Sequence, residues 1–192
     1  MKKNFPGTLF LVVGNSGSGK DSIMRGVIER YPSNLKSLYL TQRYITRPYS
    51  DTEDSIDVKP EDFKKLSLQG EFVLEWQIYG LDYGVPIEID YWLEKGHPVL
   101  VNVSRSIIKK ARRIYQNILV VFIDAPFEIT LKRVKERARE SGARLEERIL
   151  RARQNQDMPD ADFIVDNSGD LEDAINQFLE YLISIIKKKL NS

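Results

Sequence analysis

The chain has 192 residues, 42% of them hydrophobic, and this suits one domain with a substantial apolar core. It contains no cysteine, which excludes disulfides and thiolate metal sites, and its net charge of +1 gives no overall attraction to nucleic acid or membranes. The first apolar run, 8–13, leads straight into a glycine-rich loop, and no segment is long enough to span a bilayer. We therefore expect a cytoplasmic protein that acts on small molecules, while the sequence leaves the oligomeric state open.

A phosphate-binding loop is predicted near the N-terminus. Thr8–Val13 is an unbroken apolar run, typical of a buried parallel strand, and Asp21–Arg30 is predicted to be a helix with one apolar side, formed by Ile23, Met24, Val27 and Ile28. Between them lies a glycine, four free positions, a second glycine and a lysine, the spacing of a loop whose N–H groups surround a polyphosphate at a helix N-terminus. The candidate nucleotide-binding residues are Gly14, Asn15, Ser16, Gly17, Ser18, Gly19, Lys20, Asp21 and Ser22.

Asp21 occupies the position at which this motif has Ser or Thr, whose hydroxyl helps to hold Mg²⁺. The strand that usually supplies a carboxylate to the same ion has instead Asn102 and Ser104. One interpretation is that Asp21 supports Mg²⁺, directly or through water, with Ser22 or Asn102 assisting. The other is that Asp21 only caps its helix, since acidic residues favour the first turn.

The rest of the chain alternates predicted strands with predicted helices. Strands are expected at Leu38–Ile45, Phe72–Tyr83 (ending at Gly84), Val99–Val103, Ile118–Ile123 and Phe163–Val165, and Pro48–Pro60 is expected to be an exposed, turn-rich excursion. Helices are expected from Pro60, at Ile87–Lys95, Phe127 to about Gly142, Leu145–Gln154 and Leu171–Leu190. The last helix should bury Leu171, Ile175, Phe178, Leu179, Leu182, Ile185 and Ile186. This alternation predicts an α/β fold with a parallel sheet, helices on both faces and ligands at the carboxyl ends of the strands.

Arginines near strand ends are candidates for phosphate binding, because a guanidinium group pairs bidentately with phosphate. Arg43 and Arg47 leave the second strand region, and Arg105 follows Val99–Val103; for each, a solvated surface charge is the alternative. The segment 131–153 carries nine Lys or Arg against four Glu, which suits a lid that closes over a nucleotide, or else an ordinary solvated helix pair. Within it Arg133, Arg137 and Arg148 are the candidate catalytic residues, together with Lys20 in the loop. His97, in a turn, is interpreted as structural or exposed.

The chain resembles the guanylate-kinase-like nucleotide kinases over nearly its whole length. The shared segments are the Gly14–Lys20 loop, Thr46-Arg47-Pro48, Glu75-Trp76, Gly80-x-x-Tyr83-Gly84 and Arg148. The resemblance implies one P-loop NTPase domain over 1–192. Its core would comprise about 7–33, 97–130 and 155–190, its acceptor-binding region about 38–92 and its lid about 131–153.

Within that group, Gly19–Ser22, Arg43–Arg47 and Val101–Arg105 are most similar to the ribose 1,5-bisphosphate phosphokinases. This implies ATP-dependent phosphorylation of the sugar bisphosphate to 5-phosphoribosyl 1-diphosphate, with Mg²⁺, in phosphonate metabolism. Asp21 and Ser22 would hold the metal. The acceptor would contact Arg43, Tyr44, Thr46, Arg47, Glu75, Tyr83, Asn102, Ser104 and Arg105.

Several positions depart from guanylate kinases. Ser50 stands where they have a second phosphate-binding arginine, and Asp82 replaces the first tyrosine of their Tyr-Tyr-Gly. Glu75 instead favours a guanylate kinase, because in that family this acid binds the guanine edge, whereas a ribose bisphosphate has no base. A nucleoside monophosphate kinase and a non-catalytic binding module on the same fold therefore remain as alternatives.

Overall fold

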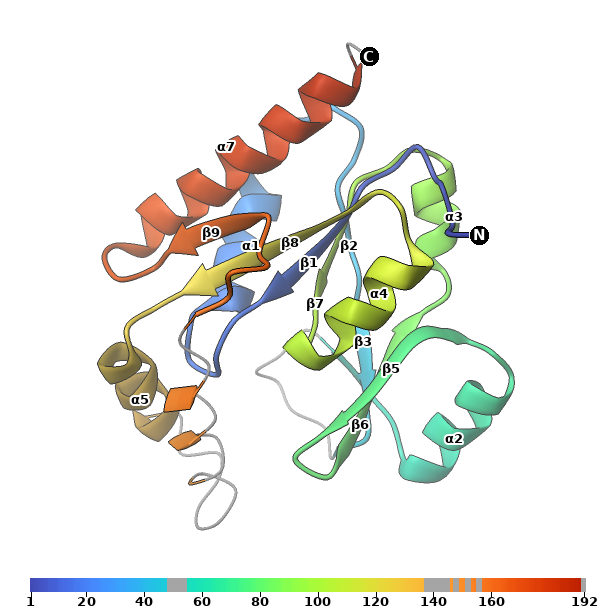
Figure 1. Cartoon of the computed structure of the whole chain (residues 1–192), viewed down its shortest axis with the longest axis horizontal. Helices are drawn as coiled ribbons and strands as arrows, with labels where there is room; N and C mark the ends of the chain where they lie inside the picture. The colour runs from blue at the N-terminus through green and yellow to red at the C-terminus, as the bar shows by residue number, and fades with distance from the viewer. Residues whose placement is uncertain (48–54, 137–145, 147–148, 151–152, 155–156, 191–192) are drawn as a thin grey trace. The chain divides into compact units, whose positions relative to one another are not determined.

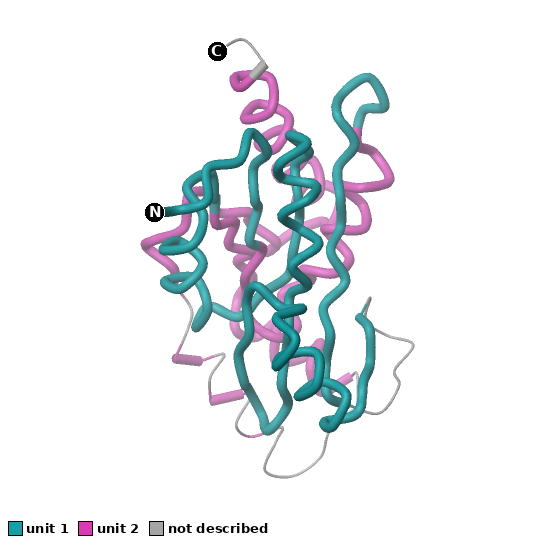
Figure 2. The backbone as a smooth tube through the Cα atoms, turned by 90° about the vertical axis from the view of Figure 1, so that its right-hand side faces the viewer, with its two compact units in different colours: residues 1–11, 32–119 teal, residues 12–31, 120–192 magenta. Residues whose placement is uncertain are grey.

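The structure is a computed structural model that describes residues 1–47, 55–136, 146, 149–150, 153–154 and 157–190 (Figure 1). The chain forms two compact units (Figure 2). Unit 1 comprises Met1–Leu11 and Pro32–Leu119, and unit 2 comprises Val12–Tyr31 and Val120–Ser192. The predicted division into core, acceptor-binding region and lid stays a prediction.

The larger sheet has five strands in the order β2-β7-β1-β8-β9. Its members are β1 (Leu9–Val13), β2 (Tyr39–Leu40), β7 (Val99–Asn102), β8 (Ile118–Asp124) and β9 (Phe163–Asp166). The pairs β2·β7 and β8·β9 are parallel, and every residue of β1 and β7 is buried. Continuous apolar runs of this kind form strands covered on both faces, so the predicted α/β class is confirmed.

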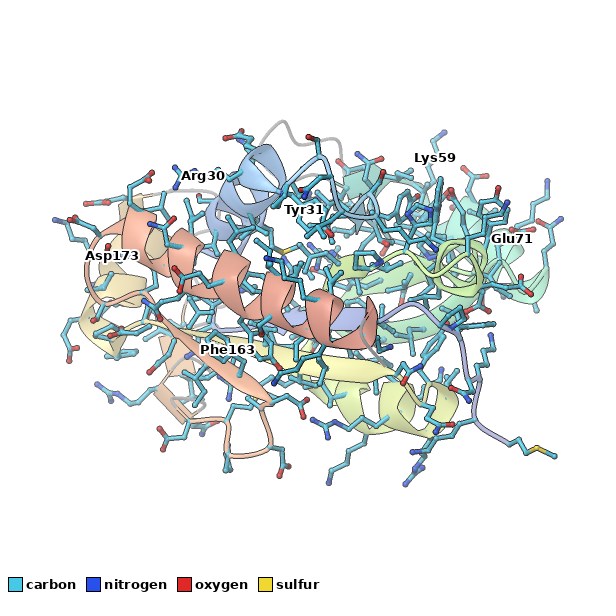
Figure 3. All side chains as sticks on the ribbon, turned by 90° about the horizontal axis from the view of Figure 1, so that it is seen from above. Arg30, Tyr31, Lys59, Glu71, Phe163 and Asp173 are labelled. Carbon is cyan, nitrogen blue, oxygen red and sulfur yellow. The ribbon has the colours of Figure 1, made fainter. Side chains whose placement is uncertain are left out.

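Unit 2 is built around α1 (Lys20–Arg30), α5 (Phe127–Glu136) and α7 (Leu171–Leu190). Helix α7 packs against α1, where Ile175 lies beside Gly26. It also packs against β9, which carries Phe163 (labelled in Figure 3). The rings of Phe163 and Tyr181 stack with their centroids 4.0 Å apart. The predicted bounds of α7 are confirmed, but the prediction that Leu171 is buried is wrong. Leu171 is 41% exposed, because it begins the helix, and the buried face starts one turn later at Ala174.

Unit 1 contains a second sheet of four strands in the order β4-β3-β6-β5. These are β3 (Arg43–Ile45), β4 (Ser55–Asp57), β5 (Phe72–Ile78) and β6 (Leu81–Pro86). The same unit includes the helices α2 (Pro60–Leu68), α3 (Ile89–Glu94) and α4 (Ile108–Ile114) and the 3₁₀ turn η1 (Arg105–Ile107). Of the two interpretations of His97, structural or exposed, the contacts favour the structural one: its Nδ1 lies 2.9 Å from Ser37 O, and its ring meets Trp92 edge-on.

Three predicted elements of unit 1 need correction. The single strand predicted over Phe72–Tyr83 is a hairpin, because Tyr79 and Gly80 turn the chain with φ of 56° and 72° while the apolar alternation continues across the turn. The strand predicted over Leu38–Ile45 is two strands, β2 and β3, that belong to different sheets. The excursion predicted over Pro48–Pro60 contains β4 and the start of α2, and its residues 48–54 lie outside the described residues.

The sequence also left the stretch after Ser104 without a prediction, whereas the structure has η1 and α4 there. Helix α5 confirms the beginning of the predicted Phe127–Gly142 helix, and the residues described within Leu145–Gln154 are helical. Across the described part of the chain, every helix is too short or too polar to cross a membrane.

Candidate functional site

The glycine-rich loop of unit 2 joins β1 to α1, and its conformation depends on two glycines with positive φ. Gly17 has φ 83° and Gly19 has φ 89°, in the left-handed region that other residues rarely adopt. A Cβ atom on Gly17 would lie 2.6 Å from Thr130 O, and one on Gly19 would lie 2.5 Å from Asn167 Nδ2. The motif therefore needs glycine at both positions for backbone angle and for space.

Lys20 begins α1, and its ammonium group lies over the loop. Its Nζ donates hydrogen bonds to Gly14 O at 2.8 Å and Asn15 O at 2.9 Å. Ser18 is fully buried, and its Oγ has no hydrogen-bond partner among the described residues. Successive backbone N–H groups, a helix N-terminus and a lysine fit a bound polyphosphate in both charge and shape.

Asp21 and Ser22 occupy the first turn of α1. Asp21 is half-buried and Ser22 is exposed. The described residues contain no cluster of three His, Asp or Glu that would hold a metal by themselves. One carboxylate, one hydroxyl and the oxygens of a bound phosphate suit Mg²⁺, which usually keeps several waters. Both interpretations of Asp21 therefore agree with its position.

Helix α5 flanks the loop and carries the one candidate lid arginine that the structure describes. Arg133 Nη1 donates a hydrogen bond to Gly17 O at 3.4 Å, and Val134 packs beside the same glycine. Lys132 forms an exposed 3.9 Å ion pair with Glu136, which fits the solvated-helix alternative for these outer charges. Arg137 and Arg148 lie outside the described residues.

In unit 1, Arg43 is a buried cation beside a pair of stacked aromatic rings. Arg43 is 8% exposed, and its Cζ lies 5.9 Å from the centre of the Tyr83 ring. Tyr83 stacks on Trp76 at 5.3 Å with an interplanar angle of 7°. A guanidinium group over an aromatic face is a favourable cation–π arrangement. The structure thus joins Arg43 of β3 to Tyr83 of β6, two residues that the sequence proposed separately.

Arg47 is held by side chains of β4. Its Nε donates to Asp57 Oδ1 at 3.1 Å and its Nη2 donates to Ser55 Oγ at 2.8 Å. The side chains of Arg47 and Asp57 are only 15% and 6% exposed. Asp57 was not among the predicted site residues, and its contact with Arg47 is the reason to add it. The neighbouring Thr46 accepts a hydrogen bond from the backbone N–H of Asp82.

The other candidate acceptor residues of unit 1 lie in three places. On the second sheet, Glu75 accepts a hydrogen bond from Ser67 at 2.8 Å, and the Tyr44 ring packs against Phe72 at 5.1 Å. At the end of β7, Asn102 is 8% exposed. Two residues after the end of β7, Ser104 caps η1, and Arg105 is the first residue of that turn.

Thr41 is a further polar residue, and it was not among the predicted site residues. Thr41 directly follows β2, and Asn102 is the last residue of β7. Because β2 and β7 are parallel neighbours, both residues lie at the carboxyl edge of the sheet. Thr41 is 4% exposed, and its Oγ1 has no hydrogen-bond partner among the described residues. Carboxyl edges of parallel strands are where α/β proteins bind ligands.

The family model for guanylate kinase matches residues 7–185 of this chain. The chain belongs to the guanylate kinase family. Curated relatives include the ribose 1,5-bisphosphate phosphokinases PhnN of Pseudomonas paraeruginosa and Azotobacter vinelandii. The first is 37% identical over 92% of this chain and 95% of the relative, and the second is 37% identical over 95% and 97%.

Solved structures support the fold. The crystal structure of guanylate kinase from Anaplasma phagocytophilum matches with a TM-score of 0.66 and 18% identity, over 96% of this chain and 88% of that one. A gluconokinase from Sinorhizobium meliloti matches with a TM-score of 0.51 and 19% identity, over 97% of each chain. The guanylate-kinase-like fold predicted from the sequence is therefore confirmed.

Proposed function

We propose that this protein is a ribose 1,5-bisphosphate phosphokinase, which uses ATP and Mg²⁺ to make 5-phosphoribosyl 1-diphosphate and ADP. The observation that carries the proposal is the 37% identity, over more than nine-tenths of both chains, to relatives with that name. The buried cation Arg43 beside Tyr83 agrees with it, because a sugar bisphosphate presents phosphates rather than a purine.

In this reaction an oxygen of the acceptor's 1-phosphate attacks the γ-phosphorus of ATP. The bond from that phosphorus to the β,γ-bridging oxygen breaks, and ADP leaves with the bond's electron pair. The attacking oxygen is already ionised near neutral pH, so the protein needs no general base. Catalysis then consists of holding the two phosphates in line and neutralising their charge.

Each group of candidate residues has a part in this scheme. The loop Gly14–Ser22 would hold the β- and γ-phosphates, with Lys20 following the transferred group and Asp21 and Ser22 holding the metal. Bound Mg²⁺ would neutralise charge on the phosphate oxygens. Arg133, Arg137 and Arg148 would approach from the lid. The acceptor would be bound by Arg43, Tyr44, Thr46, Arg47, Glu75, Tyr83, Asn102, Ser104 and Arg105.

Arg47 would bind acceptor phosphate while Asp57 and Ser55 fix its orientation. Their two hydrogen bonds, at 3.1 and 2.8 Å, engage Nε and Nη2 of the guanidinium group. A side chain fixed in this way loses little conformational entropy when it binds a ligand. Glu75, which accepts from Ser67, would meet a ribose hydroxyl.

A coupled assay of ADP release with rival acceptors tests the proposal. We expect turnover with ribose 1,5-bisphosphate and none with GMP at the same concentration. Turnover with GMP alone would identify a guanylate kinase, the alternative that Glu75 favours. ATP binding without turnover of either acceptor would favour a binding module.

A further inference from the structure

Asn167 is a buried polar residue at which three segments of unit 2 meet. It follows β9 directly and is only 1% exposed. Its backbone N–H donates to Asp124 O, at the end of β8, at 2.7 Å. Its side-chain Nδ2 donates to Ser18 O, inside the glycine-rich loop, also at 2.7 Å. We propose that Asn167 is a positioning residue that holds this loop in its anion-binding conformation.

The hydrogen bond to Ser18 solves a problem that the loop itself creates. When successive N–H groups turn toward an anion, some carbonyl groups of the same loop must turn into the protein. Ser18 is fully buried, so its carbonyl oxygen has no access to water and needs a donor from the protein. Asn167 supplies that donor. Without it, the loop would relieve the buried carbonyl by changing its conformation.

The contact between Asn167 and the loop is close enough to restrict the residue type at position 19 as well. A Cβ atom at Gly19 would approach Asn167 Nδ2 to 2.5 Å, so the amide group occupies the space that a side chain at position 19 would need. On another side of the loop, Arg133 donates to Gly17 O at 3.4 Å, and Thr130 O lies beside Gly17. The loop is therefore held between α5 and the residue that follows β9.

The amide is present at an energetic cost. Asn167 Oδ1 is buried and has no hydrogen-bond partner among the described residues. A buried acceptor without a partner is unfavourable, and a small apolar residue would fill the same space without that cost. The single bond from Nδ2 to Ser18 is the interaction that a smaller or apolar residue could not supply.

The test compares MgADP binding by wild type, Asn167→Ala and Asn167→Asp using isothermal titration calorimetry. Asn167→Asp keeps the shape but puts an acceptor against the Ser18 carbonyl. The apparent dissociation constant for MgADP is inversely proportional to the fraction of the protein whose loop has the binding-competent conformation, so it rises when that fraction falls. We expect MgADP to bind about tenfold more weakly to both variants, the ratio that follows from losing one buried hydrogen bond. In turnover assays KM for ATP should rise while KM for the acceptor stays unchanged.

Gln177→Ala is the matched control. Gln177 accepts from Asp166 N at 3.1 Å and donates to Asp166 O at 3.2 Å, so it braces the residue next to Asn167 without touching the loop. We expect this variant to bind MgADP as wild type does. An equal loss in Gln177→Ala, or wild-type binding by both Asn167 variants, would overturn the proposal.

Failure of both Asn167 variants to fold, measured by circular dichroism, would also overturn it, because Asn167 would then serve the core rather than the loop. The inference rests on the proposed function only for its nucleotide. The binding assay contains no acceptor, so a failure of ribose 1,5-bisphosphate to react would leave its outcome unchanged.

Discussion

The ion pair between Arg47 and Asp57 allows a quantitative test of the acceptor-binding region. We consider the variants Asp57→Asn and Arg47→Met, which keep approximate shape and remove one charge each. The control is Ser55→Ala, because Ser55 accepts from Arg47 at 2.8 Å and donates to Asp57 at 2.9 Å without carrying a charge. All three residues belong to unit 1, whereas the glycine-rich loop belongs to unit 2.

The size of the effect follows from distance and burial. At 3.1 Å the Coulomb attraction is about 1 kcal/mol in water and about 5 kcal/mol at an effective dielectric constant of 20. Side chains that are 15% and 6% exposed lie between these limits, and their desolvation offsets part of the gain. We expect a coupling energy of about 2 kcal/mol, a loss of about 3 kcal/mol for Asp57→Asn, and about 1 kcal/mol for Ser55→Ala.

Urea unfolding of the single and double variants measures this coupling as a double-mutant cycle. In parallel, Asp57→Asn should raise KM for the acceptor about tenfold, because the guanidinium group loses its orientation. KM for ATP should not change. A coupling energy below about 0.5 kcal/mol would mean that the pair behaves like an exposed salt bridge, and the argument for a preorganised Arg47 would then be refuted.

Three further predictions concern the loop and the core. Lys20→Met should lower kcat at least about a thousandfold in the ADP-release assay with the fold intact by circular dichroism, because a charge-neutralising group is lost at the transferred phosphate. Asp21→Asn should raise the Mg²⁺ concentration needed for half-maximal activity steeply, and an unchanged titration would assign Asp21 to helix capping alone. Burial and a 2.6 Å hydrogen bond to Asp90 raise the pKa of Tyr115 above its ordinary 10.0. The stability that this tyrosine contributes is therefore complete below pH 10 and is lost as the pH rises further. Wild type should lose unfolding free energy above pH 10 more steeply than Tyr115→Phe, as measured by urea titrations at several pH values.

Local patterns predicted residues 9–30 and the last helix well. The strand β1, the loop and α1 were predicted from a continuous apolar run, fixed glycine spacing and helical periodicity, all of which act within about twenty residues. The bounds of α7 were equally clear, and the error at Leu171 arose because periodicity does not show where a buried face begins.

Unit 1 was harder because its decisive features are not periodic. Tyr79 adopts φ 56°, a turn conformation that is rare for tyrosine and is therefore not expected from the sequence. The hairpin was for this reason predicted as one strand. The short strands β2 and β3 are separated by only two residues but belong to different sheets. A local sequence pattern does not show which strand another strand pairs with. The basic segment Ile108–Ile114 was left without a prediction, and it forms helix α4, in which Ile108 and Ala111 are buried.

The same contrast explains which site residues could be anticipated. The loop is proposed to bind phosphate through backbone groups, so it requires glycine at fixed spacing, and this spacing is visible directly in the sequence. Asp57 and Asn167 act through contacts with residues that are distant in the sequence: Asp57 accepts from Arg47, ten positions away, and Asn167 donates to Ser18, 149 positions away. The only signal for Asn167 in the sequence was a polar residue two positions after the predicted strand Phe163–Val165, a pattern that many turns share. Residues that position other residues are therefore the ones that a single sequence conceals, and here they support the glycine-rich loop of unit 2 and Arg47 of unit 1.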